Sequence, residues 1–241
     1  MSISQYKAAI ERIDPHAYIM VEIADSEEMP DLTAAQIRER SRQALVAFGD
    51  KVDLWEVGNE LNGDWVGTSP DEINAKALAA YEEIRAGGGK TAVTLNYWSS
   101  SDCIAEPWES TLEYAATMPA EFRQVDYVFL SIYETACEPV QHPSAGQIGA
   151  TLKSLSTIFP NARLGIGEVG AQTSLDGSSQ PDMAEKTRVA DYYYGLQGEL
   201  SSIVGERYVG GYFWWYFRRD VLEASDRESL WPKLDSLTSD L

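Results

Sequence analysis

The sequence predicts an α/β fold built on a parallel sheet, and two observations lead to this class. Six short apolar runs have the length of strands and are rich in β-branched or aromatic residues, and amphipathic stretches of helical length separate them. The runs lack clean polar alternation, as expected of strands buried on both faces. Strands that alternate with helices imply a parallel sheet, which is a barrel if it closes and a doubly wound sheet if it stays open.

The expected strands are the runs AYIMVEI, VDLWEVG, TAVTLNYW, VDYVFLSIY, RLGIGEVG and YVGGYFWWYF, at 17–23, 52–58, 91–98, 125–133, 163–170 and 208–217. Thr33 can cap a helix over 34–48, which stops at Gly49, and Ser69 opens another that runs to Arg85. Further helices are expected over 3–13, 108–117, 145–158, 183–203 and 227–238.

The glycine-rich text AGGGK at 86–90 precedes a strand, whereas a phosphate-binding loop follows a strand and opens a helix. We therefore interpret it as a helix end and a turn, which leaves the nucleotide-binding form of the open sheet with little support.

Composition narrows the class of function. The 241 residues are enough for one sizeable core and contain no repeat or linker, so a single domain over 1–241 is expected. The net charge of −19 repels phosphate groups, which disfavours binding to nucleic acid or to a membrane surface. No run approaches the roughly 18 apolar residues of a transmembrane helix. The first residues lack the features of a signal peptide, so the protein is cytoplasmic or has lost a leader.

Two glutamates lie where an apolar run gives way to a loop. Glu60 follows the run at 52–58 directly after Asn59, and Glu168 lies at the end of the run that begins at 163. In parallel α/β barrels the C-terminal ends of the strands carry the chemistry. Two carboxyl groups about 5–5.5 Å apart cleave a glycosidic bond with retention, one as nucleophile and one as acid and then base. The acid needs a raised pKa, from burial or from its like-charged neighbour.

These motifs resemble a known family. WEVGNELNG at 55–63 resembles the fourth-strand motif of the retaining glycoside hydrolases of the (β/α)8-barrel clan (clan A), and GIGEVG at 165–170 resembles their seventh-strand motif. The resemblance spans most of the chain and implies a TIM-barrel-like fold. It also implies that Glu60 is the acid/base, that Glu168 is the nucleophile and that Asn59 binds a sugar hydroxyl.

The same resemblance assigns aromatic residues. Tyr133, which ends VFLSIY, matches the sixth-strand tyrosine that holds the nucleophile. Many members have His two residues earlier, where this chain has Ser131. FWWYF at 213–217 resembles the eighth strand, in which a tryptophan forms the floor of the sugar site, and either Trp214 or Trp215 fits that role.

Other residues face the same proposed mouth. Trp65, Asn96 and Trp98 fit sugar binding and loop packing equally well, and Asp25 follows the first run closely enough to reach the cleft. Three further glutamates are candidates of lower rank. Glu56 is interpreted as structural, and Glu134 and Glu138, which follow Tyr133 in the next loop, are runner-up carboxylates that are interpreted as solvated.

The order of the runs also matches the clan. The two glutamates end the second and fifth runs, and the fourth and seventh strands of the clan differ by the same interval of three. The resemblance thus implies an incomplete (β/α)6 barrel that corresponds to strands 3–8, without the arginine that the second strand commonly supplies. The chain is then a natural remnant, a fragment or one half of a pair. Because an open parallel edge invites association, a homodimer through the open barrel edge is favoured.

The two cysteines, Cys103 and Cys137, lie in loops that neighbouring strands place side by side, so the alternatives are a disulfide or two free thiols. A bridge would imply an oxidising compartment, hence a secreted or periplasmic protein. With two cysteines and two histidines, no metal site is expected, and no cofactor is needed.

The leading expectation is a retaining β-glycosidase that hydrolyses a β-linked oligo- or polysaccharide by double displacement. One alternative is a barrel relic that binds carbohydrate without turnover. Another is an α/β enzyme that uses the acidic pair with Mg²⁺ on a phosphorylated substrate, although the lack of a phosphate loop and of basic residues argues against it.

Overall fold

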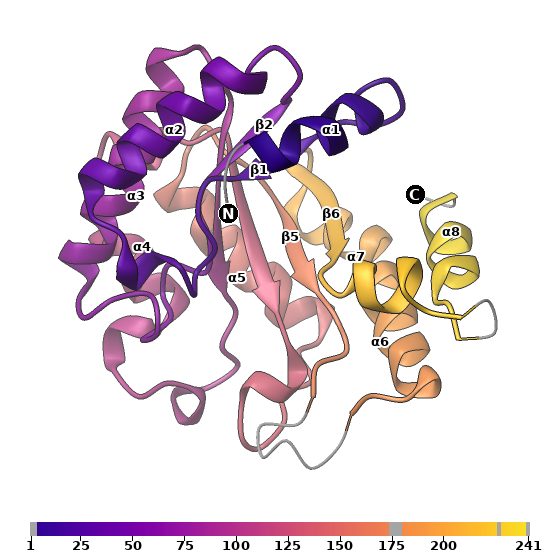
Figure 1. Ribbon diagram of the computed structural model, residues 1–241. Coiled ribbons are helices and arrows are strands. Elements are labelled where there is room, and N and C mark those ends of the chain that lie inside the picture. The colour runs from indigo at the N-terminus through magenta and orange to yellow at the C-terminus, as the bar shows by residue number, and fades with distance from the viewer. Residues whose placement is uncertain (1–3, 174–179, 226–227, 240–241) are drawn as a thin grey trace.

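Six parallel strands form one sheet, in which the strands lie side by side in the order of the sequence (Figure 1). The computed structural model describes residues 4–173, 180–225 and 228–239. All six expected strands are confirmed, as β1 Met20–Glu22, β2 Leu54–Gly58, β3 Thr91–Asn96, β4 Tyr127–Ile132, β5 Arg163–Val169 and β6 Tyr208–Trp214. Every neighbouring pair is parallel, so the C-terminal ends of all the strands meet at one edge of the sheet.

Helices cover the outer face of this sheet. They are α1 Ser4–Ile13, α2 Ala34–Phe48, α3 Pro70–Ala86, α4 Thr111–Thr117, α5 Ala145–Ile158, α6 Met183–Gly195, α7 Gln197–Val204 and α8 Trp231–Ser239. Figure 1 shows α2, α3 and α4 along one side of the sheet and α6, α7 and α8 beside β6. Shorter turns complete the loops, namely η1 Met29–Asp31, η2 Ser101–Cys103, η3 Pro107–Glu109, η4 Phe122–Gln124, η5 Glu134–Ala136 and the π-helical η6 Arg218–Leu222.

The start signals in the sequence act as expected. Thr33 caps α2 and exchanges hydrogen bonds with Gln36, which forms a complete capping box. The Ser69 hydroxyl accepts a hydrogen bond from the Glu72 N–H at the start of α3. The glycine-rich segment ends α3, and Gly88 has a φ of 81°, a value that favours glycine. It is therefore a helix end and a turn, as predicted.

Two of the expected helices are interrupted. The helix expected over 108–117 is divided into η3 and α4, and the one expected over 183–203 is divided into α6 and α7. Gly195 and Gly198 flank the second break and weaken a continuous helix there. The helix expected over 227–238 is α8, and residue 227 lies outside the described residues.

The apolar core lies between the sheet and its helices. Its largest fully buried side chains come from strands, helices and loops alike: Trp55, Tyr114, Tyr193, Phe122, Phe159, Met29, Ile37, Leu61, Ile73, Ile84, Leu95 and Met118. Close contact between β5 and β6 needs glycine, because a Cβ at Gly211, with a φ of 111°, would lie 2.1 Å from the carbonyl oxygen of Ile166. This contact brings the end of β5, where Glu168 lies, against β6.

The sheet curls without closing. Within the described residues β1 pairs only with β2, and β6 pairs only with β5. The aromatic ring of Phe213 on β6 contacts Phe129 on β4, yet Phe213 remains 45% exposed. The incomplete barrel of six strand–helix units expected from the sequence is therefore confirmed. A homodimer through this edge stays a prediction. None of the described helices is both long and apolar enough to cross a membrane.

Candidate active site

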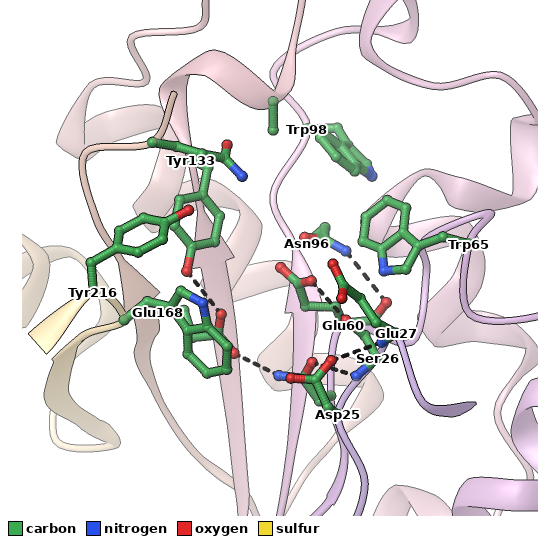
Figure 2. Close-up of a pocket in the computed structure, with 14 residues that line it drawn as sticks. Asp25, Ser26, Glu27, Glu60, Trp65, Asn96, Trp98, Tyr133, Glu168 and Tyr216 are labelled. Carbon is green, nitrogen blue, oxygen red and sulfur yellow. Dashed lines mark hydrogen bonds between the residues drawn. The ribbon is translucent and has the colours of Figure 1, made fainter. Parts of the chain in front are cut away.

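A cavity of about 250 Å³ lies where the C-terminal ends of the strands meet (Figure 2). Loops after all six strands contribute to it. The lining residues are Asp25, Ser26, Glu27, Asn59, Glu60, Trp65, Asn96, Trp98, Tyr133, Ala136, Glu168, Gln172, Trp215 and Tyr216. The structure thus brings together every residue named as catalytic or sugar-binding in the sequence except Trp214.

Glu60 enters the cavity from the end of β2. Its φ of 47° is unusual for a residue with a side chain, and such backbone strain clusters at functional sites. The Ser131 hydroxyl donates to Glu60 Oε1 at 2.6 Å, and the Ser26 hydroxyl donates to Oε2 at 3.2 Å. Burial raises the pKa of Glu60. The two hydrogen bonds lower this pKa, and the charges of nearby carboxylates such as Asp25 raise it.

Glu168 enters the same cavity from the end of β5. The Asn59 amide donates to Glu168 Oε1 at 2.5 Å, and the Tyr133 hydroxyl donates to Oε2 at 3.0 Å. Burial raises the pKa of Glu168 well above its ordinary value, and the charges of Glu60 and Glu56 raise it further. The two donated hydrogen bonds act in the opposite direction. The pKa values of both glutamates are therefore raised, and burial is the first cause in each case.

Two asparagines organise this edge of the sheet. The Oδ1 atom of Asn59 accepts from the Ser26 N–H at 3.2 Å, which turns the Asn59 amino group toward Glu168. Asn96 donates through Nδ2 to the backbone oxygen of Glu60 at 3.3 Å. Its backbone N–H donates to Asn62 Oδ1 at 2.7 Å, so Asn62 ties the loop after β2 to β3.

Aromatic side chains form the walls of the cavity. Figure 2 shows Trp65 and Trp98 on one side, and Tyr133 and Tyr216 on the other. Trp65 is 38% exposed and packs on Gly63, where a Cβ would lie 2.6 Å from the indole ring. Half-exposed aromatic faces at a cavity rim are suited to stacking on an apolar sugar face.

The structure decides between the two tryptophans of the last strand. Trp215 lines the cavity and is 45% exposed. Trp214 is buried on the other side of the strand, where its indole N–H donates to Asp220 Oδ2 at 2.9 Å. Successive residues of a strand point to opposite faces, so only one of the pair can reach the cavity. Of the two alternatives, Trp214 does not reach the cavity, and Trp215 remains the candidate for sugar binding.

Sequence reasoning missed several residues of the cavity. Asp25, left open as a candidate, does line it. The residues that were not anticipated are Ser26, Glu27, Ala136, Gln172 and Tyr216. Tyr216 directly follows Trp215, and Ser26 and Glu27 directly follow Asp25, so nearness to a strand end was the available signal.

Glu134 departs from its expected solvated state. It is 6% exposed and forms an ion pair with Arg188 of α6, and it also accepts from the Tyr193 hydroxyl at 3.3 Å. This position fastens the loop after β4 to a helix. Glu134 therefore supports Tyr133 from outside the cavity, whereas Glu138 is exposed as expected.

Cys103 and Cys137 form a disulfide. Cys103 belongs to the loop after β3, downstream of Trp98, and Cys137 belongs to the loop after β4, downstream of Tyr133. The bridge therefore joins two loops that each supply a wall residue of the cavity. Gln141 reinforces this junction, because its amide donates to the Tyr133 carbonyl oxygen at 2.9 Å.

The cavity is acidic. Its described lining includes the carboxyl groups of Asp25, Glu27, Glu60 and Glu168 and contains no Lys, Arg or His. Nowhere in the described ranges do three or more His, Cys, Asp or Glu residues form a group suited to a metal ion.

Comparison with known proteins places the fold. No family model matches the chain, and no curated protein sequence matches it. Among solved structures, a GH10 xylanase from Bispora sp. MEY-1 has a TM-score of 0.57 at 13% identity, over 89% of this chain and 68% of that protein. A thermostable mutant of the xylanase Xyn10A from Cellvibrio japonicus has a TM-score of 0.59 at 12% identity, over 89% and 72%. A family 1 β-glucosidase from Thermotoga maritima has a TM-score of 0.60 at 14% identity, over 88% and 67%.

The chain has the fold of the barrel glycoside hydrolases. The resemblance seen in the sequence motifs is thus matched by the backbone, although identities of 12–14% establish the fold alone.

Proposed function

We propose that the protein is a retaining β-glycosidase that hydrolyses a β-linked oligo- or polysaccharide. One observation carries the proposal: in a glycosidase-like fold, a partly buried carboxyl group from the end of β2 and a buried one from the end of β5 enter one cavity with aromatic walls. The xylanases and the β-glucosidase with this fold suggest a neutral sugar. An acidic lining without cations also suits neutral, hydroxyl-rich ligands better than anionic ones.

Hydrogen bonding supports different roles for the two glutamates. Glu168 accepts from the Asn59 amino group, which can only donate, so this contact favours the carboxylate form. Glu60 contacts the hydroxyls of Ser131 and Ser26, which can donate or accept and therefore tolerate a protonated carboxyl. This difference fits Glu168 as the nucleophile and Glu60 as the acid/base.

The reaction follows from these roles. Glu168 attacks the anomeric carbon while Glu60 gives its proton to the departing glycosidic oxygen, and a covalent glycosyl ester forms on Glu168. Glu60, now a carboxylate, then takes a proton from water as the water oxygen attacks the same carbon and releases Glu168. Two inversions give net retention. The Tyr133 hydroxyl stabilises the Glu168 carboxylate before the attack and after its release.

The disulfide supports an extracellular or periplasmic location, because such bonds persist in oxidising compartments. A secreted enzyme would also meet polymeric carbohydrate directly. Detection of the bridge in protein from the native host, by mass spectrometry after thiol blocking, tests this location. Free thiols at both positions would contradict it.

A second candidate function is carbohydrate binding without turnover. It is favoured by the open side of the barrel, where Phe213 is 45% exposed, and by the raised pKa of Glu168, which reduces the supply of the nucleophilic carboxylate. Catalytic geometry tolerates errors of only about 0.5 Å, so an incomplete barrel can keep a sugar site and lose its chemistry.

The test is hydrolysis of a panel of aryl β-glycosides and β-glucans by the wild type and by Glu168→Ala, Glu60→Ala and Glu109→Gln. Glu109 is a buried carboxyl outside the cavity, so its variant controls for the loss of a buried charge. We expect Glu168→Ala to abolish turnover and Glu60→Ala to retain most activity on substrates with good leaving groups. Calorimetric binding of the same sugars without turnover would favour the second candidate, and neither binding nor turnover would contradict both.

A further inference from the structure

Gln141 lies in the loop after β4 and is only 3% exposed. It does not line the cavity, so it does not bind a sugar there directly. A buried amide is costly unless hydrogen bonds satisfy its oxygen and its amino group. The partners of the amide therefore show what Gln141 does in the folded protein.

The Gln141 side chain makes three hydrogen bonds to the backbone of two loops. Its amino group donates to the carbonyl oxygen of Tyr97 at 3.2 Å and to that of Tyr133 at 2.9 Å. Its Oε1 atom accepts from the Ser99 N–H at 3.0 Å. A carbonyl oxygen only accepts and a backbone N–H only donates, so these partners fix which way round the amide lies.

These bonds hold two wall residues of the cavity. Two of them are to the residues directly before and after Trp98, so the backbone is fixed on both sides of that tryptophan. The third holds the carbonyl group of Tyr133, whose hydroxyl donates to Glu168 Oε2 at 3.0 Å. Figure 2 shows Trp98 and Tyr133 on opposite sides of the cavity. One buried amide thus connects both walls.

Gln141 is itself anchored. Its backbone N–H donates to the carbonyl oxygen of Glu134 at 2.9 Å, which closes the loop between the two residues. Glu134 is buried and forms an ion pair with Arg188 of α6. The disulfide between Cys103 and Cys137 joins the same two loops. Because the base of the side chain is fixed in this way, its amide can hold its partners in place.

We propose that Gln141 is a positioning residue: its hydrogen bonds set the place of Trp98 in the sugar site and direct the Tyr133 hydroxyl at Glu168. The catalytic consequence of this inference rests on the proposed glycosidase function. The effect of Gln141 on the Glu168 carboxyl does not depend on turnover.

The link to Glu168 runs through the Tyr133 hydroxyl. Burial raises the pKa of Glu168 most and neighbouring carboxylates raise it further, while the Tyr133 hydrogen bond lowers it. A hydrogen bond weakens steeply when its geometry is poor, so a displaced Tyr133 should let the pKa of Glu168 rise. The titratable groups that act on this pair include Glu22 on β1, Glu56 in β2, Glu60 after β2 and Tyr216 after β6. A substitution at position 141 replaces none of these groups, so a shift of the Glu168 pKa reports the lost amide.

Three variants separate positioning from packing. Gln141→Met keeps the size of the side chain and removes all three of its hydrogen bonds. Gln141→Asn keeps an amide but shortens its reach by one methylene, and it provides the test if Gln141→Met does not fold. The matched control is Asn74→Leu, which removes a buried amide outside the cavity that bonds to Thr117 and Tyr114.

The experiment is a pH titration of the Glu168 carboxyl carbon by NMR on protein labelled with ¹³C at glutamate side chains. The signal is assigned by its loss in Glu168→Gln. We expect Gln141→Met to raise the Glu168 midpoint by about half a pH unit or more, Gln141→Asn to raise it by less, and Asn74→Leu to leave it unchanged. In a Tyr133→Phe background Gln141→Met should add little, because the hydroxyl through which it acts is gone. An unchanged midpoint in both Gln141 variants, or an equal added shift in that background, would overturn the proposal.

Binding and kinetics provide the second arm. Gln141→Met should weaken sugar binding by about threefold or more in calorimetry, and it should add little to the loss in Trp98→Ala. The acidic limb of kcat/KM should move to higher pH in Gln141→Met and stay in place in Asn74→Leu. A loss of thermal stability with an unmoved limb and unchanged sugar binding would show a merely structural role and overturn the proposal. If the wild type shows no turnover, the proposed glycosidase function fails while the NMR titration still decides the role of Gln141.

Discussion

Tyr133→Phe removes a single hydrogen bond from the nucleophile candidate. In the structure the Tyr133 hydroxyl donates to Glu168 Oε2 at 3.0 Å, and both side chains are buried. A hydrogen bond to a charged group contributes about 1.5–3 kcal/mol. Since one pKa unit corresponds to about 1.36 kcal/mol, loss of this bond should raise the Glu168 pKa by about one to two units.

The sign of the kinetic effect follows from the role of Glu168. The Tyr133 hydrogen bond lowers the Glu168 pKa, so its removal raises that pKa further above its ordinary value. A nucleophile must be ionised, and the acidic limb of kcat/KM for an aryl β-glycoside should therefore move to higher pH by about the same one to two units. Activity below this limb should fall by about 10- to 100-fold, and the plateau should change less.

Tyr114→Phe is the matched control. The Tyr114 hydroxyl is equally buried and donates to Asn74 Oδ1 at 2.9 Å, outside the cavity. This variant should lower thermal stability and leave the acidic limb in place. An acidic limb that stays fixed in Tyr133→Phe, or that moves to lower pH, would refute the reasoning.

Three further predictions concern stability and binding. Cys103→Ser removes a disulfide that joins positions 34 residues apart. The free energy of unfolding should fall by about 3–4 kcal/mol, and Tm should fall by about 6–16 °C. An unchanged melting curve would contradict this prediction. Trp215→Ala should weaken sugar binding about 10-fold by calorimetry, whereas Trp231→Ala, at an exposed tryptophan outside the cavity, should not. Asp220→Asn should lower the free energy of unfolding by about 1–3 kcal/mol. Burial alone raises the pKa of Asp220, but hydrogen bonds and the charges of neighbours such as Arg219 hold that pKa below its ordinary value. The stabilisation by ionised Asp220 is present above about pH 4 and is lost as the pH falls through the lowered pKa. The difference in Tm between wild type and Asp220→Asn should therefore shrink in acid. A difference that stays constant with pH would count against the ion pairs.

Local signals were sufficient for the elements and their order. The strands lie within the predicted apolar runs, and α2 begins at Thr33 because a capping box involves residues only three positions apart. Glu60 and Glu168 were found because parallel strands all end at one edge of the sheet, which is a rule of topology and needs no coordinates. The end of α3 at Gly87 could also be predicted from the sequence, because glycine commonly ends helices.

Contacts between segments that are distant along the chain could not be predicted from the sequence. Glu134 looked like a loop glutamate until α6 was seen to bring Arg188 against it, and Trp214 and Trp215 could not be separated before the register of β6 assigned one of them to the core. Glu56 had the pattern of a structural strand residue, and the structure adds that the Thr94 hydroxyl on β3 donates to its buried carboxyl. Which residues form the strands, and which carboxyl groups end them, could be predicted from the sequence because those properties depend on neighbours along the chain. The donors and charges that surround each carboxyl could be identified only in the folded protein, because hydrogen bonds and burial depend on strands and loops that are far apart in sequence and meet in the sheet.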